Sequence, residues 1–281
     1  MQGRCVMVLA IVLMSAATGA AQEIESTQLF PVVARTTGVG DSQWVSDLTV
    51  SNLMGEEVTV GIQFFPENQE NTFDPDFPER FQLGPRETRV IEDVLATVFG
   101  YTTNIKGALV ISVEQDFIPE NPEEATIAAI TRTYNTADPA GTYGQTVPAL
   151  EATSVNTSPL IATGARNDDA FRSNLGMVSL SIFDEIRVHY RILAPDGGQL
   201  AVGVKTLPTA TIKQWSLDQL GVGTVDGAMT VELWLDEDSV SDDPCDDFAN
   251  TLMGYVSKVD NGTGDAEFIY AAPTEEYFCP D

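Results

Sequence analysis

The chain has 281 residues, and its 42 acidic side chains outnumber the 14 basic ones to give a formal net charge of −28 at pH 7. A negative field of this size disfavours nucleic acid and anionic membrane surfaces as partners. Hydrophobic residues make up 43% of the chain, which is enough to bury a core in each of two domains or in one large sandwich.

The N-terminus has the layout of a secretory signal peptide. Arg4 precedes an apolar run over residues 5–14, and small residues follow as far as Ala21, where cleavage is expected. The apolar run is shorter than the roughly 20 residues of a spanning helix, although an uncleaved anchor is the alternative. No later stretch is apolar for long enough to cross a membrane. Residues 1–21 are therefore predicted to be removed, and the mature chain is predicted to be secreted or held at the cell surface.

Two cysteines, Cys245 and Cys279, remain once the signal peptide with Cys5 is removed. An even pair in an oxidising compartment predicts a disulfide. This bridge would tie the C-terminal tail to an acidic loop, and two free thiols are the alternative.

One stretch of the chain is repeated. WVSDLTVSNL at 44–53 returns as FRSNLGMVSL at 171–180. Alternate positions hold an aromatic residue, a Ser and a Leu in both copies, which predicts a strand with one buried face. The residues are Trp44, Ser46 and Leu48 in the first copy and Phe171, Ser173 and Leu175 in the second. The chain is therefore predicted to contain an internal duplication.

The first copy is predicted to consist of short strands with one helix. The segment from Val58 alternates apolar and polar residues, so a half-buried strand forming a hairpin with 44–53 is expected. Helical spacing of apolar residues within 88–100, ended by Gly100, predicts a short helix. The remaining strands are expected at 29–35, 80–83, 110–113 and 125–134, with an acidic, Pro-containing loop at 66–78 and a closing segment at 141–150.

The second copy follows in the same order. Residues 159–162 match 31–34, and 186–192 match the strand from Val58. The segment 215–220 stands where the helix of the first copy stood. Short strands separated by turn signals predict an all-β fold with two tandem immunoglobulin-like β-sandwich repeats, 22–150 and 151–281, each with one short helix. A single sandwich to which each copy lends one sheet is the alternative.

Several strings together resemble a repeat found in uncharacterised secreted bacterial proteins. They are SQWVSDLTVSN, GPRETRVIEDVLATVFG, GALVIS, AITRTYNTADPAGTYGQTVPAL, FRSNLGMVS and SKVDNGTGDAEFI. The resemblance covers nearly the whole mature chain. It implies a secreted or surface β module of accessory or adhesive type, and it transfers no functional residues.

Sequence motifs of catalysis are absent. The chain has one histidine, His189, and lacks the GxSxG and HExxH patterns. Paired carboxylates could hydrolyse a glycoside, but with 42 acidic residues any fold offers such pairs. The sequence therefore favours a protein that is not an enzyme, with a secreted glycoside hydrolase as a minor alternative.

Calcium is the ligand that the acidic loops suggest, because hard cations prefer clustered carboxylate and carbonyl oxygens. Neither candidate loop, 236–247 or 260–265, has the spacing of an EF-hand, and a solvated acidic loop is the simpler interpretation. No other cofactor is expected. The candidate ligands are Asp236, Asp238, Asp242, Asp243, Asp246, Asp260 and Asp265.

A basic stripe and one tryptophan form the candidate interaction face. Arg187, His189 and Arg191 alternate with apolar residues in IRVHYRIL, and Arg172 is expected on the same face of the preceding strand. Cross-strand pairing with acidic residues is the simpler interpretation. Trp234 alternates with acidic residues and is the tryptophan expected at the surface, whereas Trp44 and Trp215 occupy apolar positions of the pattern and are expected in the core.

These features predict a secreted, non-catalytic structural or interaction protein with an adhesion-like role. An extracellular polymer or another protein is the expected partner. A carbohydrate-binding module is the main alternative, and it requires Trp234 and the Arg187 to Arg191 stripe to be exposed together.

Overall fold

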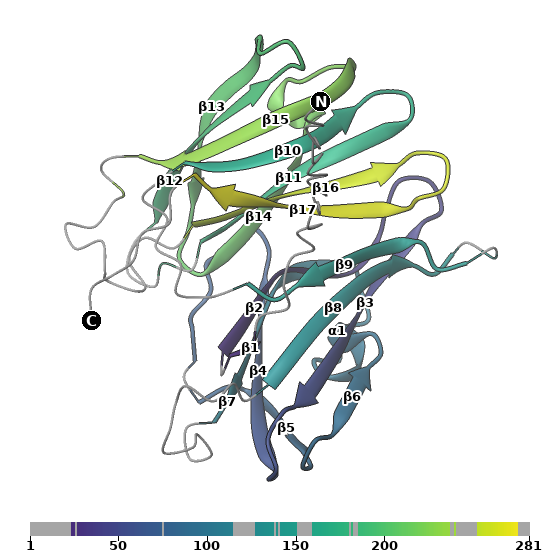
Figure 1. The fold of residues 1–281 in the computed structure, drawn as a ribbon, viewed down its shortest axis with the longest axis vertical. Helices are drawn as coiled ribbons and strands as arrows, with labels where there is room; N and C mark the ends of the chain where they lie inside the picture. Colours follow the sequence, from purple (N-terminus) through teal and green to yellow (C-terminus); the bar gives the residue numbers. More distant parts are fainter. Residues whose placement is uncertain are drawn as a thin grey trace, which may run out of the picture.

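The computed structural model describes residues 24–25, 27–74, 76–114, 127–137, 139, 141–150, 159–179, 181, 185–236, 239 and 252–274. Within this part the chain is all-β, as predicted, and its sheets stack as in a sandwich (Figure 1). The predicted signal peptide and both cysteines of the predicted disulfide lie outside the described residues. Among the helices that the structure describes, none has the length and apolar character that a membrane crossing requires.

The described chain falls into an N-terminal half, residues 24–150, and a C-terminal half, residues 159–274. The N-terminal half contains β1 (Ile24–Glu25), β2 (Thr27–Thr37), β3 (Gln43–Asn52), β4 (Val58–Pro66), β5 (Glu79–Leu83), β6 (Thr88–Ile91), α1 (Val94–Thr97), β7 (Ile105–Val113), β8 (Ile127–Asn135) and β9 (Gly144–Pro148). The C-terminal half contains β10 (Leu160–Asn167), β11 (Phe171–Ser179), β12 (Ile186–Leu193), β13 (Gln199–Leu207), β14 (Thr211–Ser216), the 3₁₀ turn η2 (Asp218–Leu220), β15 (Val225–Leu235), β16 (Leu252–Asp260) and β17 (Ala266–Pro273).

Strands of the two halves pair in the same order. In the N-terminal half, the antiparallel strands β6-β3-β8-β9 form one four-stranded layer, called ladder 1. The antiparallel strands β5-β4-β7-β2 form a second layer, called ladder 2. In the C-terminal half, β14-β11-β16-β17 form ladder 3 and β13-β12-β15-β10 form ladder 4. The halves differ where their ladders join, because β2 also pairs with β3 whereas β10 pairs with β17. These joins produce one nine-stranded and one eight-stranded sheet.

The repeated triplets lie at equivalent places in β3 and β11. Leu48 and Leu175 are fully buried, and Ser46 and Ser173 are buried beside them. Each half has its own apolar core, between ladders 1 and 2 and between ladders 3 and 4. The prediction of one buried face in these strands is therefore confirmed for the Ser and Leu positions.

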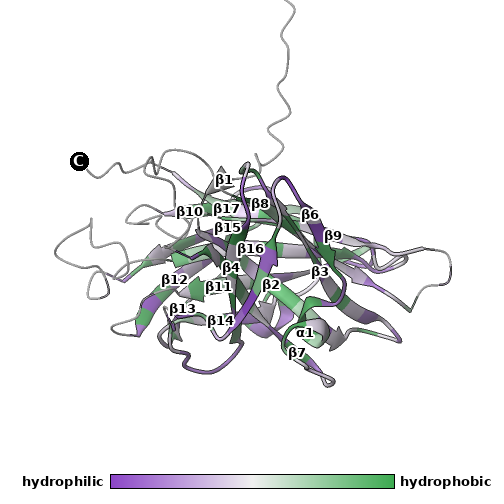
Figure 2. Cartoon of the chain, turned by 90° about the horizontal axis from the view of Figure 1, so that it is seen from below, coloured by the Kyte–Doolittle hydropathy of each residue, from purple (hydrophilic) through white to green (hydrophobic). Residues whose placement is uncertain are grey.

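The predicted hairpin between the Trp44 and Val58 strands is wrong. β3 pairs with β2, β6 and β8, while β4 pairs with β5 and β7. After Asn52 the chain crosses from ladder 1 to ladder 2, so strands that are consecutive in the sequence face one another across the core, as in a β-sandwich. Figure 2 shows hydrophobic and hydrophilic residues along strands such as β12 and β13, whose burial alternates.

The predicted helix of the first copy is shorter than its pattern suggests. Residues 88–91 form strand β6, and α1 spans only Val94–Thr97, with Asp93 accepting a hydrogen bond from the backbone N–H of Ala96. Its counterpart in the second copy is the single 3₁₀ turn η2, and Trp215 belongs to strand β14.

A third apolar core joins the two halves. It lies between the outer face of ladder 2, with Phe65 and Val110, and the outer face of ladder 3, with Ile212, Met253 and Tyr255. The C-terminal half lies above the N-terminal half in Figure 1, and this core fills their junction. Ladder 2 is thus buried on both faces, which is why β4 is buried over most of its length and not at alternate positions.

Candidate functional site: a cleft between the halves

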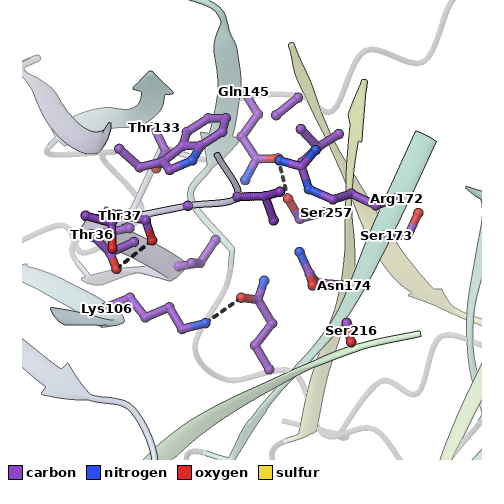
Figure 3. A pocket seen from close by; sticks show the side chains of 18 of the residues that line it. Thr36, Thr37, Lys106, Thr133, Gln145, Arg172, Ser173, Asn174, Ser216 and Ser257 are labelled. Atoms are coloured by element: carbon purple, nitrogen blue, oxygen red, sulfur yellow. Dashed lines mark hydrogen bonds between the residues drawn. The ribbon is translucent and has the colours of Figure 1, made fainter. Parts of the chain in front are cut away.

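A cleft of about 410 Å³ opens between the two halves. Its N-terminal wall comes from β2, the β2–β3 turn, β3, β7, β8 and β9, and its C-terminal wall comes from β10, β11, β14, η2, β16 and β17. Figure 3 shows Lys106 and Arg172 on opposite sides of this space. Because the shared core packs the two halves together, the walls are held in place without a ligand.

The two cations of the cleft have different surroundings. Lys106 Nζ donates a hydrogen bond to Gln214 Oε1 across the halves, at 2.8 Å, and lies 3.3 Å from Glu67 Oε2. Arg172 Nη1 donates to Asn261 Oδ1 at 2.8 Å. Within the described part of the chain Arg172 forms no ion pair, and burial lowers the pKa of its guanidinium. Arg172 is therefore a half-buried cation without an acidic partner there, in a chain whose net charge is −28.

Two side-chain amides also have unused hydrogen-bonding groups at the cleft. Gln145 Oε1 accepts from Ser257 Oγ at 3.0 Å (Figure 3), and Gln145 Nε2 has no partner among the described residues. The side chain of Asn174 lines the same space and has no hydrogen bond to any residue that the structure describes. Asn174 is half-buried, so its amide and that of Gln145 could bond a polar ligand in place of water.

Trp44 lines the cleft, half-buried, and does not lie in the core as its position in the pattern predicted. Its indole Nε1 donates to Ser42 Oγ at 3.2 Å. Gly38 makes this placement possible, because a Cβ there would lie 2.4 Å from Trp44 Nε1. Trp215, the other tryptophan expected in the core, is also only partly buried, at the edge of the C-terminal core.

Among the described lining residues the cleft has one carboxylate, Asp218. Its Oδ1 accepts a hydrogen bond from Asn167 Nδ2 at 2.9 Å. Glycoside hydrolysis needs a second carboxylate roughly 5 to 9.5 Å away across the substrate. The lining therefore suits binding better than this reaction.

The structure brings Arg187, His189, Arg191 and Trp234 together on the outer face of ladder 4. His189 is directly opposite Trp234, and their rings stack with centroids 5.2 Å apart and planes at 7°. The guanidinium of Arg191 lies 5.8 Å from the centre of the indole ring.

The basic side chains of this face already have acidic partners. His189 Nε2 lies 2.8 Å from Asp236 Oδ2, and Arg187 lies 3.7 Å from the same oxygen. Arg191 pairs with Glu232 at 2.5 Å. The geometry matches the cross-strand pairing that was the simpler interpretation of the stripe.

Arg172 does not share this face, so that part of the prediction is wrong. β11 pairs with β14 and β16, whereas β12 pairs with β13 and β15. Strands that follow one another in the sequence thus lie in different layers, and Arg172 belongs to the cleft.

The calcium candidates that the structure describes form no group of acidic, His or Cys side chains that could hold a metal ion. Asp236 is paired with the ladder 4 cations, and Asp260 Oδ1 accepts the backbone N–H groups of Gly262 and Thr263, each at 2.8 Å. Hydrogen bonds from Thr263 and Gly262 lower the pKa of Asp260. The carboxylate of Asp265 also belongs to no group of acidic, His or Cys side chains that could bind a metal ion in the described part of the chain. Asp238, Asp242, Asp243 and Asp246 lie outside the described residues.

Sequence reasoning missed the cleft because its lining is assembled from distant segments. Thr36 and Ser257 line one space although most of the chain separates them. To predict that these residues share a cleft, one would have to know which faces of the two halves pack against each other. Arg172 and Trp44 were noticed, but each was assigned to another environment.

Comparisons with known proteins place this chain in no family. No family model matches, and no curated protein matches. Among solved structures, Bacteroides uniformis beta-glucuronidase 2, covalently bound to cyclophellitol-6-carboxylate aziridine, is 10% identical, and the match covers 88% of this chain and 26% of that chain with a TM-score of 0.17. The chain thus spans about a quarter of that structure, and a match of this TM-score supports no conclusion about fold or activity.

Proposed function

We propose that this chain is a secreted, non-catalytic binding module whose ligand occupies the cleft between two tandem repeats. The observation that carries the proposal is Arg172, a half-buried guanidinium at the cleft with no ion pair in the described chain. A guanidinium without a carboxylate partner keeps charged donors free for an anionic group. A ligand that pairs with Arg172 would use these donors, which makes the cleft the candidate binding site.

The proposal of two immunoglobulin-like repeats, 22–150 and 151–281, is supported by strand pairing. Ladders 1 and 2 correspond strand for strand to ladders 3 and 4. Each half also encloses its own core, which favours two sandwiches over one sandwich built from both copies. The resemblance to a repeat of secreted bacterial proteins agrees with this organisation and with export.

A non-catalytic role is supported by the chemistry of the lining. The cleft offers amides, hydroxyls, two cations and an indole, with Asp218 as the single carboxylate among the described lining residues. The histidine of the chain, His189, is on ladder 4 and paired with Asp236. A hydrolase would need a general acid and a nucleophile or base facing one another.

A cleft-filling variant tests the proposal. Residues 22–281 would be screened by thermal unfolding against soluble glycans and peptides, since a ligand of the native state raises the melting temperature. Asn174→Trp, which removes no hydrogen bond within the described chain, should abolish the shift by filling the cleft. Thr206→Trp, on the exposed face of β13, is the matched control and should keep it. Ligand shifts that survive in Asn174→Trp, or a panel that shifts neither protein, would contradict a ligand-binding cleft.

A further inference from the structure

We infer that the ligand of this cleft is a saccharide carrying a carboxylate, such as a uronic-acid mono- or disaccharide. This inference rests on the proposed function and specifies its ligand. It follows from three features of the described lining, which are one unpaired guanidinium, a set of neutral hydrogen-bonding groups on both walls, and a volume of about 410 Å³.

Charge is the first feature. The net charge of −28 repels anions at long range. A cation at the cleft attracts an anion only at short range, so it favours an anionic ligand that fits beside it. The guanidinium has five N–H donors in a planar fork that matches a carboxylate, and its hydrogen bond to Asn261 leaves most of them available. Partial burial weakens the competition from water, which strengthens an Arg–carboxylate pair.

Neutral polar groups are the second feature. Gln145 Nε2 and Asn174 offer amide groups from opposite halves, and Ser216 adds a hydroxyl on the C-terminal wall (Figure 3). Sugar hydroxyls both donate and accept hydrogen bonds, so amides and hydroxyls suit them better than they suit an apolar ligand. Trp44 adds an aromatic surface of the kind that packs against the C–H groups of a sugar ring.

Size and rigidity are the third feature. A volume of about 410 Å³ lies at the lower end of typical small-ligand sites, roughly 300 to 1,000 Å³. Lys106 and Gln214 bridge the halves at 2.8 Å, and the shared core packs beneath them. A preformed site loses little conformational freedom on binding, so recognition of a short saccharide requires no closure of the two halves.

Calorimetric titration of residues 22–281 tests the inference. The probes are a uronic-acid disaccharide, the matching neutral disaccharide and a sulfated disaccharide. We expect the uronic-acid form to bind at least about 10-fold more tightly than the neutral form, as a charged hydrogen-bonded pair provides.

Variants assign the selectivity to Arg172. Arg172→Gln should weaken uronic-acid binding about 10- to 100-fold and leave neutral binding unchanged, while Arg172→Lys should recover part of the loss because it keeps the charge but not the fork. Arg191→Gln, on ladder 4, is the matched control and should bind as the unaltered protein does. Equal melting temperatures would show that each variant is folded.

Different failures have different meanings. Equal affinity for neutral and acidic disaccharides would overturn the carboxylate inference but leave the proposed binding function standing. Preference for the sulfated disaccharide would show that the cleft recognises negative charge and not the shape of a carboxylate. This result would also overturn the carboxylate inference. Binding of acidic peptides in the cleft, with no saccharide bound, would do the same, and binding that Asn174→Trp does not reduce would overturn both proposals.

Discussion

Ser46 and Ser173 form the same hydrogen bond in the two halves of the molecule. The hydroxyl oxygen of Ser46 accepts the backbone N–H of Ala34 at 2.8 Å, and that of Ser173 accepts the backbone N–H of Arg166 at 3.0 Å. Both serines are buried, and in each half the bond ties the second strand of the repeat to the first across the two ladders. The repeated sequence triplet therefore preserves a contact as well as a pattern.

Replacing either serine by alanine should destabilise the fold. Each change leaves a backbone N–H without its partner, at a cost of about 1 to 3 kcal/mol. Ser46→Ala should cost more, because Ser46 Oγ also bonds Thr133 Oγ1 at 2.6 Å. Urea denaturation measures the difference. Ser51→Ala, which removes an exposed bond to Thr88, is the control, and equal costs for Ser46→Ala and Ser51→Ala would disprove the role of the buried bond.

Tyr255→Phe should stabilise the protein. Tyr255 is fully buried in the core between the halves, and its hydroxyl has no hydrogen-bond partner in the described chain. Burial raises the pKa of this phenol well above its usual range. Removing an unsatisfied buried hydroxyl should raise the free energy of unfolding by about 1 kcal/mol.

Tyr134→Phe is the comparison for that change. The Tyr134 hydroxyl donates to Asp47 Oδ1 at 3.2 Å, so its removal should lower the free energy of unfolding. Chemical denaturation of the two variants should give opposite signs. A loss of stability in Tyr255→Phe would mean that the hydroxyl is satisfied in solution.

Asp47→Asn should stabilise the protein at neutral pH. Burial raises the pKa of Asp47, partly offset by the hydrogen bond from Tyr134 and the charge of Arg132. A raised pKa means that the folded state holds the proton more tightly than the unfolded state, so ionisation of Asp47 costs stability as the pH rises through the folded-state pKa. Below its ordinary value, about 3.9, both states are protonated and the cost disappears. The gain from Asp47→Asn should therefore be present at pH 7 and absent near pH 3.

Asp260→Asn should have the opposite effect on stability at neutral pH. Backbone hydrogen bonds from Thr263 and Gly262 lower the pKa of Asp260, so its ionised form stabilises the fold above the ordinary pKa, and this contribution is lost as the pH falls through the folded-state value. Asp260→Asn should destabilise at pH 7 and have little effect near pH 2. Denaturation curves at both pH values measure the two variants, and equal effects at the two pH values would contradict the assignment.

The ladder 4 ion pair between Arg191 and Glu232 should contribute little. The pair joins neighbouring strands at 2.5 Å, and the Arg191 side chain is 45% exposed. A double-mutant cycle with Arg191→Ala and Glu232→Ala should give a coupling energy of about 0.2 to 1 kcal/mol that declines with added salt. A coupling above about 2 kcal/mol, unchanged by salt, would contradict this description.

The sequence predicted the strands of each copy better than their partners. Period-two patterns identified the buried serine and leucine of β3 and β11, because burial on one face depends mainly on local alternation. The crossing from β3 to β4 was not predicted, since hairpin and crossover connections leave the same local pattern. The two-sided burial of β4 was not predictable either, because Thr59, Gly61 and Gln63 alternate with apolar residues as in a strand with one buried face, although Gly61 and Gln63 are buried.

For the candidate site, the sequence identified single residues but not the residues that lie next to them in the fold. Arg187, His189 and Arg191 were assigned to one face from their alternation within a single strand, whereas the pairing of β12 with β15, which puts Trp234 opposite His189, could not be read from that pattern. Arg172 and Trp44 were not joined, because the cleft exists only where the two halves dock. Docking depends on which outer face of one half packs against which outer face of the other. The periodicity of a strand shows which face is apolar but not which surface will cover it.

Ladder 2 docks on ladder 3 through an apolar core, so the two halves use different surfaces for this contact. The surface of the C-terminal half that corresponds by strand pairing to the docked face of ladder 2 is the outer face of ladder 4. Arg187, His189 and Arg191 lie on this face, and Arg187 and Arg191 are exposed. An apolar surface that packed there would have to remove water from these side chains, which is costly for charged groups. The outer face of ladder 4 is therefore unsuited to repeat the apolar contact that its counterpart makes between the halves.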